Sequence, residues 1–321
     1  MTISEFDLID KFFRSRSKRR PGVVLGIGDD CALLEIPPGR LLAVTADTLL
    51  SGVHFLADTD PGGLGHKALA VNLSDLAAMG ATPAWLTLSL TLPEVDEIWL
   101  DAFATGFLSL ADEHGAVLVG GDMSRGPLSI TVQAHGLVPT GGGLRRSGAR
   151  PGDAVLITGT VGDAGLGLEI RQGSGDCGPV ARDYLCQRLE RPTPRVSAGI
   201  ALLPLASAAI DVSDGLAQDL NHILEASAVG ASLFLDALPL SEALQEVLSV
   251  ERGRQMAMTA GDDYELCFTC PREQLETVKT ALHDSETRVT EIGVIEAQKG
   301  LRVVDGSEPA GGRLASGYRH F

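Results

Sequence analysis

The stretch Lys67-Ala-Leu-Ala-Val-Asn72-Leu-Ser-Asp75-Leu-Ala-Ala-Met-Gly80 combines small apolar residues with one amide and one acid. Its apolar spacing predicts a helix over residues 64–79, and Gly80 is a typical residue just beyond a helix end. Asn72 and Asp75 are three residues apart and therefore share one helix face. An ionised carboxylate among apolar neighbours is costly, so Asp75 needs a cation or hydrogen-bond donors beside it.

Strand and helix patterns alternate on both sides of this helix. Apolar runs predict strands over residues 23–25, 41–45, 85–92, 116–119 and 129–138, and a second helix is predicted over 94–114. A short helix is predicted at the start of the chain, because Ser4 can cap it and Asp7 follows three residues later. The basic run from Arg14 to Arg20 is interpreted as a solvated connector.

A boundary is predicted in the stretch 139–152, which holds five glycines, two prolines and three arginines. Beyond it, strands are predicted over 154–158, 231–236, 264–269 and 288–295, and helices over 216–226, 241–248 and 272–282. A chain of 321 residues is about twice the usual length of one domain. We therefore expect two mixed α/β (α+β) domains, over residues 1–140 and 150–321.

Composition and charge exclude several classes of protein. The chain is 44% hydrophobic and 21% charged, which is ordinary for a globular protein. Its formal net charge of −16 disfavours nucleic-acid or anionic-membrane binding, since both need a positive surface. The longest apolar stretch, Ile200–Ile210, contains Pro204 and is too short to span a bilayer. Acidic residues precede the first basic one, and the five cysteines lack framework spacing, so a cytoplasmic setting is expected.

The common phosphate-binding loops are absent from the sequence. It has no G-x-x-x-x-G-K-[ST] loop, no protein-kinase signature and no G-x-S-x-G elbow. The segment Gly162-Asp-Ala-Gly165-Leu-Gly167 is interpreted as a tight strand-to-helix turn. Cys267 and Cys270 lie three apart in a predicted strand, so they point to opposite faces and are interpreted as packing residues.

Acidic residues recur where apolar segments end. They are Asp30, Asp47, Asp122, Asp211, Asp214, Asp262 and Asp263. Taken singly, an aspartate beside a glycine is turn chemistry. Taken together at strand ends, where ligands often bind in mixed sheets, these oxygens suit Mg²⁺. With two or more Mg²⁺ ions, an acidic protein can hold an anionic phosphate substrate. The sequence thus predicts that these carboxylates, together with Asp75, meet in one magnesium site.

These residues, in this order, resemble the thiamine-monophosphate kinases, within the superfamily of aminoimidazole ribonucleotide synthetase and selenophosphate synthetase. The matching stretches cover essentially the whole chain and include Gly26-Ile-Gly-Asp-Asp30, Asp47-Thr48, Gly52-Val-His54-Phe55, Gly120-Gly-Asp122, Arg146-Ser-Gly-Ala-Arg-Pro-Gly-Asp153, Asp211-Val-Ser-Asp-Gly215, Gly261-Asp-Asp-Tyr-Glu-Leu266 and Gly317-Tyr-Arg-His-Phe321. The resemblance implies the two-domain fold of that superfamily. Its N-terminal domain dimerises through its sheet, and the nucleotide lies between the domains.

The resemblance also implies the activity. It is the ATP-dependent phosphorylation of thiamine phosphate to thiamine diphosphate, the last step in making that cofactor, by direct transfer and with several Mg²⁺ ions. A need for K⁺ stays open. The implied metal ligands are Asp30, Thr45, Asp47, Asp75, Asp122, Asp211 and Asp214. Those implied for ATP are Gly121, Asp122, Arg146 and Ser213, and those for thiamine phosphate are His54, Asp262 and Tyr318.

Two positions depart from the family pattern, and three residues have a second interpretation. Ala46 stands where threonine is frequent, and Asp262 where glutamate is usual, which shortens its reach by one methylene. Arg146 could be a solvated linker residue, His54 a structural one, and Tyr318 could pack the tail or stack on a ring. The rival functions are another enzyme of the superfamily and an acidic protein that binds metal or nucleotide without turnover.

Overall fold

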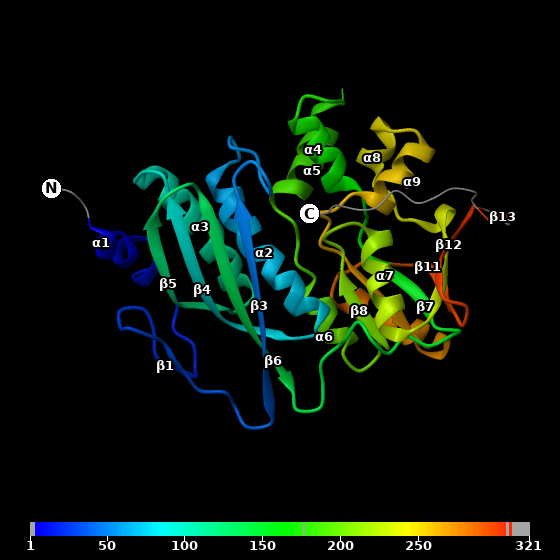
Figure 1. The fold of residues 1–321 in the computed structure, drawn as a ribbon, viewed down its shortest axis with the longest axis horizontal. Coiled ribbons are helices and arrows are strands. Elements are labelled where there is room, and N and C mark those ends of the chain that lie inside the picture. Colours follow the sequence, from blue (N-terminus) through cyan, green and yellow to red (C-terminus); the bar gives the residue numbers. More distant parts are fainter. Residues whose placement is uncertain (1–3, 176, 306–307, 310–321) are drawn as a thin grey trace. The chain divides into compact units, whose positions relative to one another are not determined.

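The computed structural model describes residues 4–175, 177–305 and 308–309. The chain divides into two compact units (Figure 1). The first contains the chain up to Leu76 together with Ala81–Gly142, and the second contains Ala77–Gly80 and the chain from Gly143 onward. Each unit is a mixture of helices and sheet, as the sequence predicts.

The first unit is built on a four-stranded sheet. Its elements in chain order are α1 (Glu5–Ile9), the short π-helix η1 (Asp10–Arg14), β1 (Val23–Leu25), β2 (Leu33–Leu34), β3 (Arg40–Leu50), α2 (Pro61–Ala78), β4 (Thr82–Leu92), α3 (Glu97–Glu113), β5 (Val117–Arg125) and β6 (Ser129–Pro139). The sheet order is β3-β6-β4-β5. Strand β6 is antiparallel to both neighbours, whereas β4 and β5 are parallel.

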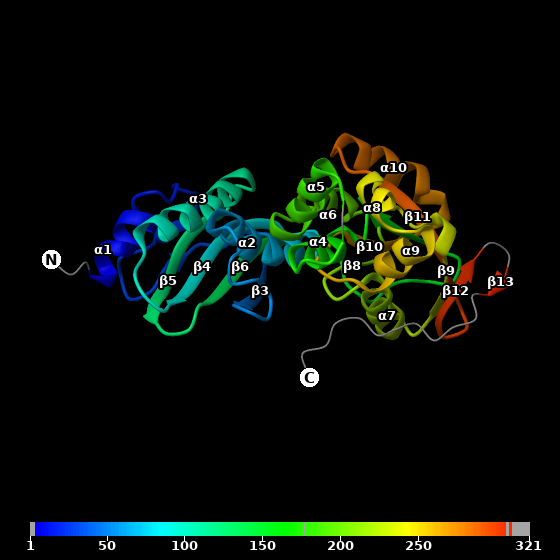
Figure 2. The ribbon, with the colours of Figure 1, turned by 90° about the horizontal axis from the view of Figure 1, so that it is seen from above.

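Helices α2 and α3 cover one face of this sheet (Figure 2). On β6, Ile130, Val132 and Ala134 are fully buried beneath them, and the intervening Thr131 and Gln133 belong to the other, open face. The two helices cross closely, because a Cβ atom on Gly65 would overlap the carbonyl oxygen of Phe103. Glycine at this crossing therefore fixes the position of α2, and with it the position of Asp75.

The N-terminal segment is attached to α3. The predicted capping box is confirmed, since the Ser4 side chain accepts from the Asp7 amide and Asp7 accepts from the Ser4 amide. The basic run is largely exposed, in agreement with its interpretation as a solvated connector. Two of its side chains form ion pairs at the surface: Arg16 pairs with Asp101 at 3.1 Å, and Lys18 pairs with an acid further along α3.

The second unit contains a seven-stranded sheet. Its elements are β7 (Ala154–Thr158), α4 (Asp163–Arg171), α5 (Pro179–Glu190), α6 (Val196–Leu202), β8 (Ala208–Asp211), α7 (Leu216–Ser227), β9 (Gly230–Phe234), η2 (Leu235–Ala237), α8 (Glu242–Val247), α9 (Val250–Thr259), β10 (Leu266–Cys270), η3 (Arg272–Gln274), α10 (Leu275–Asp284), β11 (Val289–Glu296), β12 (Gly300–Asp305) and β13 (Glu308–Pro309). The strand order is β13-β12-β9-β11-β7-β10-β8. Within this sheet, β12 and β9 are the one parallel pair among the described strands.

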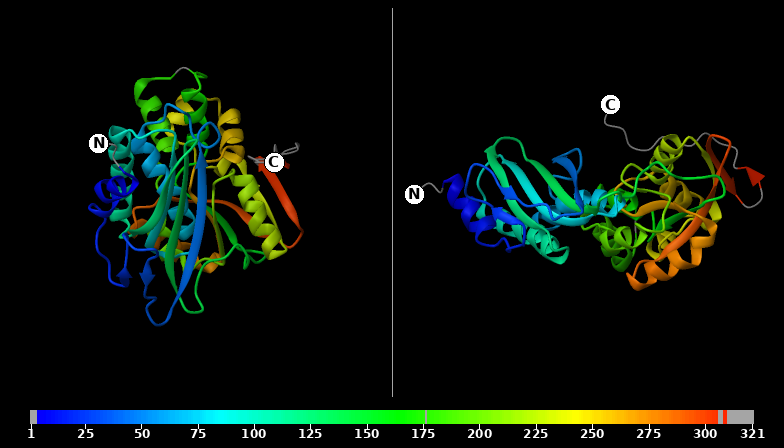
Figure 3. Two further views of the ribbon diagram at one scale, coloured as in Figure 1. Left: turned by 60° about the vertical axis from the view of Figure 1, so that its left-hand side comes forward. Right: turned by 90° about the horizontal axis from the view of Figure 1, so that it is seen from below.

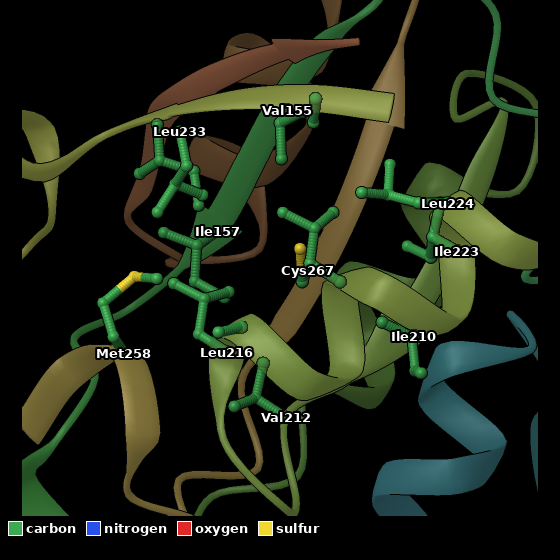
Figure 4. Close-up of a cluster of buried hydrophobic side chains, with 14 of the residues drawn as sticks. Val155, Ile157, Ile210, Val212, Leu216, Ile223, Leu224, Leu233, Met258 and Cys267 are labelled. Atoms are coloured by element: carbon green, nitrogen blue, oxygen red, sulfur yellow. The ribbon is translucent and has the colours of Figure 1, made fainter. Parts of the chain in front are cut away.

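Helices lie on both faces of the second sheet, with α7 and α10 on opposite sides (Figures 2 and 3). Beneath α7, side chains from β7, β8 and β9 contribute to an apolar cluster that includes Val155, Ile210 and Leu233 (Figure 4). Cys267 belongs to this cluster and Cys270 is also buried, so the interpretation of the two cysteines as packing residues is confirmed. The predicted turn at Gly162 is confirmed as well, because this residue is the left-handed N-cap of α4.

Candidate active site

Three predicted ligands of the first unit lie together. Thr45 and Asp47 both lie on the helix-covered face of β3, and Asp75 lies on α2. The Thr45 hydroxyl donates a hydrogen bond to the Asp75 carboxylate. Burial, and secondarily the charge of Asp75, raises the pKa of Asp47 to about 6. Two carboxylates therefore face each other in a half-buried setting, where a cation would relieve their repulsion.

A fourth oxygen on the same helix face lacks a partner. The Asn72 side chain is fully buried, and its Oδ1 accepts no hydrogen bond within the described part of the chain. Leaving such an acceptor unpaired costs about 1–3 kcal/mol. Carboxylate, hydroxyl and amide oxygens are the hard donors that Mg²⁺ prefers, so the residues present fit this ion. The described residues contain no group of three or more histidine, cysteine or acidic side chains close enough to hold a metal.

Asp122 lies elsewhere on the sheet. In the strand register, Asp47 aligns across Val132 and Leu88 with Gly121, three strands away. Three inter-strand spacings amount to about 14 Å. Asp122 is one residue further on and points to the open face, whereas Asp47 points to the helix-covered face. Within one chain, Asp47 and Asp122 are therefore too far apart to share one ion.

Gly121 is required by its surroundings. Its φ is +154°, and a Cβ atom there would overlap the Leu88 carbonyl oxygen of the neighbouring strand. The Asp122 carboxylate accepts a hydrogen bond from the Ser124 hydroxyl at 2.7 Å. The backbone of Gly121 and the carboxylate of Asp122 thus lie next to each other on the edge strand β5.

Two further predicted residues of this unit lie in loops. Asp30 is exposed in the loop after β1, where its amide donates to the Asp29 carboxylate at 2.9 Å. His54 lies in the turn after β3, and its Nδ1 accepts a hydrogen bond from the Leu50 amide at 3.0 Å. This contact assigns the ring proton of a neutral His54 to Nε2.

In the second unit, the loop after β8 carries three predicted residues. Asp211 is buried at the end of β8, and Ser213 and Asp214 follow before α7. Their backbone is held by Asp219, whose Oδ2 accepts hydrogen bonds from the amides of Ser213, Asp214 and Gly215 at 3.0, 3.0 and 3.2 Å. Burial raises the pKa of Asp219 to about 7 despite these three donors.

Asp262 lies in a second loop that pairs with the first. Its amide donates to the Ser213 carbonyl at 2.9 Å, and the Tyr264 amide donates to the Val212 carbonyl at 2.9 Å. Asp262 and Tyr264 both have left-handed φ values, +67° and +51°, and the Tyr264 hydroxyl donates to Asp262. The structure therefore brings Ser213, Asp214 and Asp262 together on two joined loops.

The neighbouring acids Asp263 and Glu265 point into the interior. Asp263 accepts from the Gly162 amide at 2.7 Å at the start of α4, and burial raises its pKa to about 8. Burial alone would raise the pKa of Glu265, but Arg195 and Arg188 hold it below the usual value. The guanidinium of Arg195 contacts both Glu265 oxygens at 2.6 Å.

The buried contacts of Asp263 and Glu265 hold the loop of Asp262 in place from the protein interior. Sequence reasoning missed Arg188, Arg195 and Asp219. Of these three, only Asp219 had a signal in the sequence, because it is an acid in the first turn of a predicted helix, where it can accept hydrogen bonds from backbone amides. Arg146 is exposed, and its carbonyl oxygen accepts from the Ser227 hydroxyl at 3.2 Å. Tyr318 lies outside the described residues. Within the described residues, none of the helices has the length and apolar character needed to cross a bilayer.

The chain is similar to known proteins over its full length. Residues 28–138 match the AIR synthase related protein, N-terminal domain, and residues 150–306 match the C-terminal domain. A thiamine-monophosphate kinase from Escherichia coli is 48% identical over 100% of this chain and 99% of its own length. A crystal structure of thiamine-monophosphate kinase from Stenotrophomonas maltophilia superposes with a TM-score of 0.88 at 47% identity, covering 97% of this chain and 99% of that one.

A third relative was solved with ligands. The structure of AaThiL complexed with AMPPCP and TMP has a TM-score of 0.77 at 32% identity, and covers 100% of this chain and 99% of that one. The two matched domains and the fold define an AIR synthase-related protein. Within that class, the chain belongs to the thiamine-monophosphate kinase family, and it is a kinase.

Proposed function

We propose that this kinase transfers the γ-phosphoryl group of ATP to thiamine phosphate, releasing ADP and thiamine diphosphate. The main observation in support is the full-length similarity to AaThiL, which was solved with the ATP analogue AMPPCP and with TMP. The two groups of residues described above support the proposal, because each brings acidic side chains together, Asp47 and Asp75 between β3 and α2 and Asp214 and Asp262 on two joined loops.

The proposed roles follow the resemblance residue by residue. The metal ligands are Asp30, Thr45, Asp47, Asp75, Asp122, Asp211 and Asp214; ATP contacts Gly121, Asp122, Arg146 and Ser213; and thiamine phosphate contacts His54, Asp262 and Tyr318.

The reaction needs little acid–base chemistry. An oxygen of the anionic phosphate monoester forms a bond to the γ-phosphorus while the bond from that phosphorus to the bridging oxygen breaks, and ADP leaves with those electrons. No strong general base is needed, so the chain's task is to align the two phosphates in line. Bound Mg²⁺ ions supply the positive charge that neutralises the phosphate oxygens. Arg146 adds a cation of the protein itself, and His54 offers its Nε2–H to an anionic oxygen.

We further propose that the protein is a homodimer formed through the sheet of the first unit. The open face of β3 exposes apolar side chains: Val44 is 59% exposed and Leu50 41% exposed. Since Asp47 and Asp122 occupy opposite edge strands, a second copy could bring its own β5 edge to β3. Such an arrangement would bring the strand that carries Asp122 of one chain next to the strand that carries Asp47 of the other.

The decisive experiment is a product assay. Purified full-length protein is incubated with ATP, Mg²⁺ and thiamine phosphate, and thiamine diphosphate and ADP are quantified. Equal amounts of both products support the proposal. ADP without thiamine diphosphate points to another enzyme of the superfamily, and nucleotide binding without either product points to a binding protein. Both of these results overturn the proposed function.

A further inference from the structure

The orphaned Asn72 oxygen has a defined direction. The Asn72 Nδ2 donates to the Ala68 carbonyl at 3.2 Å. The reversed amide would place two acceptors against each other, so the hydrogen bond fixes which atom is oxygen. The Oδ1 therefore points away from that carbonyl.

The direction of Asn72 around the helix axis is set by its neighbours. Successive residues of an α-helix are rotated by about 100°. Taking Asp75 as the origin, Leu76 lies at about 100° and Asn72 at about 60°, between the two. Asp75 faces β3 through Thr45, and Leu76 faces β6, since a Cβ on Gly136 would contact its methyl groups. Asn72 is therefore directed toward the sheet, between β3 and β6.

The position of Asn72 along β3 follows from the same contacts. Leu76 lies over Gly136, which pairs with Ala43, whereas Asp75 lies at Thr45. Earlier residues of α2 therefore lie opposite later residues of β3. One helical turn before Asp75, Asn72 lies at the level of Asp47, on the face that both carboxylates share.

Ionised carboxylates offer Asn72 Oδ1 no proton, and the Thr45 hydroxyl already donates its hydrogen to Asp75. A cation satisfies all three oxygens at once, and an amide oxygen adds a neutral ligand that does not increase the negative charge. We propose that Asn72 Oδ1 is a direct ligand of the divalent cation held by Asp47 and Asp75, with Thr45 as the fourth protein oxygen. This inference rests on the metal role of these acids in the proposed function.

The test measures binding of Mn²⁺ as a Mg²⁺ substitute to the full-length protein without nucleotide. Free Mn²⁺ is counted by electron paramagnetic resonance, and the relevant site is the one that Asp75→Asn removes. Asn72→Leu keeps the approximate volume but has no acceptor, and we expect it to weaken this site at least about tenfold. Asn72→Asp restores an oxygen and should bind within about threefold of wild type or tighter. Ser74→Ala, a buried polar deletion on another face of α2, is the matched control and should bind as wild type does.

A second readout separates a ligand from a structural residue. In EDTA, Asn72→Leu should unfold at the wild-type temperature or above it, because an unpaired buried acceptor has been removed. Added Mg²⁺ should raise the unfolding temperature of wild type and of Ser74→Ala but not of Asn72→Leu. If the leucine variant does not fold, Asn72→Ala replaces it.

The experiment distinguishes failure of the Asn72 proposal from failure of the metal assignment in the proposed function. Wild-type Mn²⁺ affinity in a folded Asn72→Leu protein, with the site still lost in Asp75→Asn, overturns the role of Asn72 only; the orphaned oxygen then binds a buried water. Absence of any Mn²⁺ site that depends on Asp75 overturns the metal assignment and this inference together.

Discussion

The Asp219 carboxylate on α7 accepts a hydrogen bond from the backbone amide of Asp214 at 3.0 Å. With the two bonds on either side, from Ser213 and Gly215, it fixes the backbone of the loop that carries the proposed ligands. The residue that shapes this loop is therefore distinct from the residues that we propose to meet the ligand.

Asp219→Ala should damage both stability and turnover. Three amides would lose a shared acceptor, which costs about 2–3 kcal/mol in unfolding free energy. Asp219→Asn keeps one carbonyl oxygen and should recover most of that loss. Urea unfolding and the Michaelis constant for ATP measure the two effects. An alanine variant with wild-type values for both would contradict the role of Asp219.

Asp263 should make stability depend on pH. Its folded pKa of about 8 lies above the ordinary value of 3.8, so the folded protein binds more protons between these values. This contribution is full below about pH 4 and is lost as the pH rises through about 8. Asp263→Asn keeps an acceptor for the α4 amide and should flatten this decline. The test is to measure the free energy of unfolding of both proteins by chemical denaturation between pH 5 and 9. If this free energy falls equally steeply with pH in wild type and in the variant, the role of Asp263 is contradicted.

Much of the fold could be predicted because strand and helix periods reflect burial directly. The alternation on β6 and the small-residue pattern of α2 both correspond to the faces that the structure buries. Helix α5 was missed because its sequence is polar and follows glycines. Its buried Arg188 is stabilised by Glu265, a partner 77 positions further along the chain.

The candidate site was less predictable, for reasons of register and direction. Asp262 and Asp263 are adjacent, yet Asp262 lies beside Ser213 on the two joined loops, whereas Asp263 accepts a hydrogen bond at the start of α4. The left-handed φ of Asp262 accompanies this change of direction. Likewise, no local pattern shows that Asp47 and Asp122 point to opposite faces, because that depends on pairing across three strands.

Asp262→Asn should affect one substrate only. Asparagine tolerates the left-handed backbone, so this change removes the charge with little strain. Thiamine phosphate carries a cationic thiazolium ring, and losing one charge contact should raise its Michaelis constant about tenfold. Steady-state kinetics with each substrate varied checks this, with the exposed Asp284→Ala as control. An effect confined to ATP would place Asp262 at the nucleotide instead.

Magnesium affinity should fall in acid. Metal binding requires deprotonated carboxylates, and the pKa of Asp47 is raised to about 6. Below that pH, affinity for the first Mg²⁺ should weaken about tenfold per pH unit, and above it the affinity should level off. Calorimetric titration of the nucleotide-free protein from pH 5 to 8 measures this. Asp47→Asn should bind weakly at every pH; a flat profile in wild type would refute the linkage.

Mixing two inactive variants tests whether the site spans two chains. Asp47→Asn and Asp122→Asn should each abolish turnover while the fold survives, since each removes a ligand charge and no core packing. If Asp47 of one chain and Asp122 of the other share a site, a mixed dimer has one site with both changes and one intact site. After unfolding and refolding an equal mixture, half of the dimers are mixed, so about a quarter of wild-type activity should return. If both residues act within one chain, every site carries a change and refolding the mixture restores nothing; circular dichroism of each variant alone verifies that loss of activity is not loss of fold.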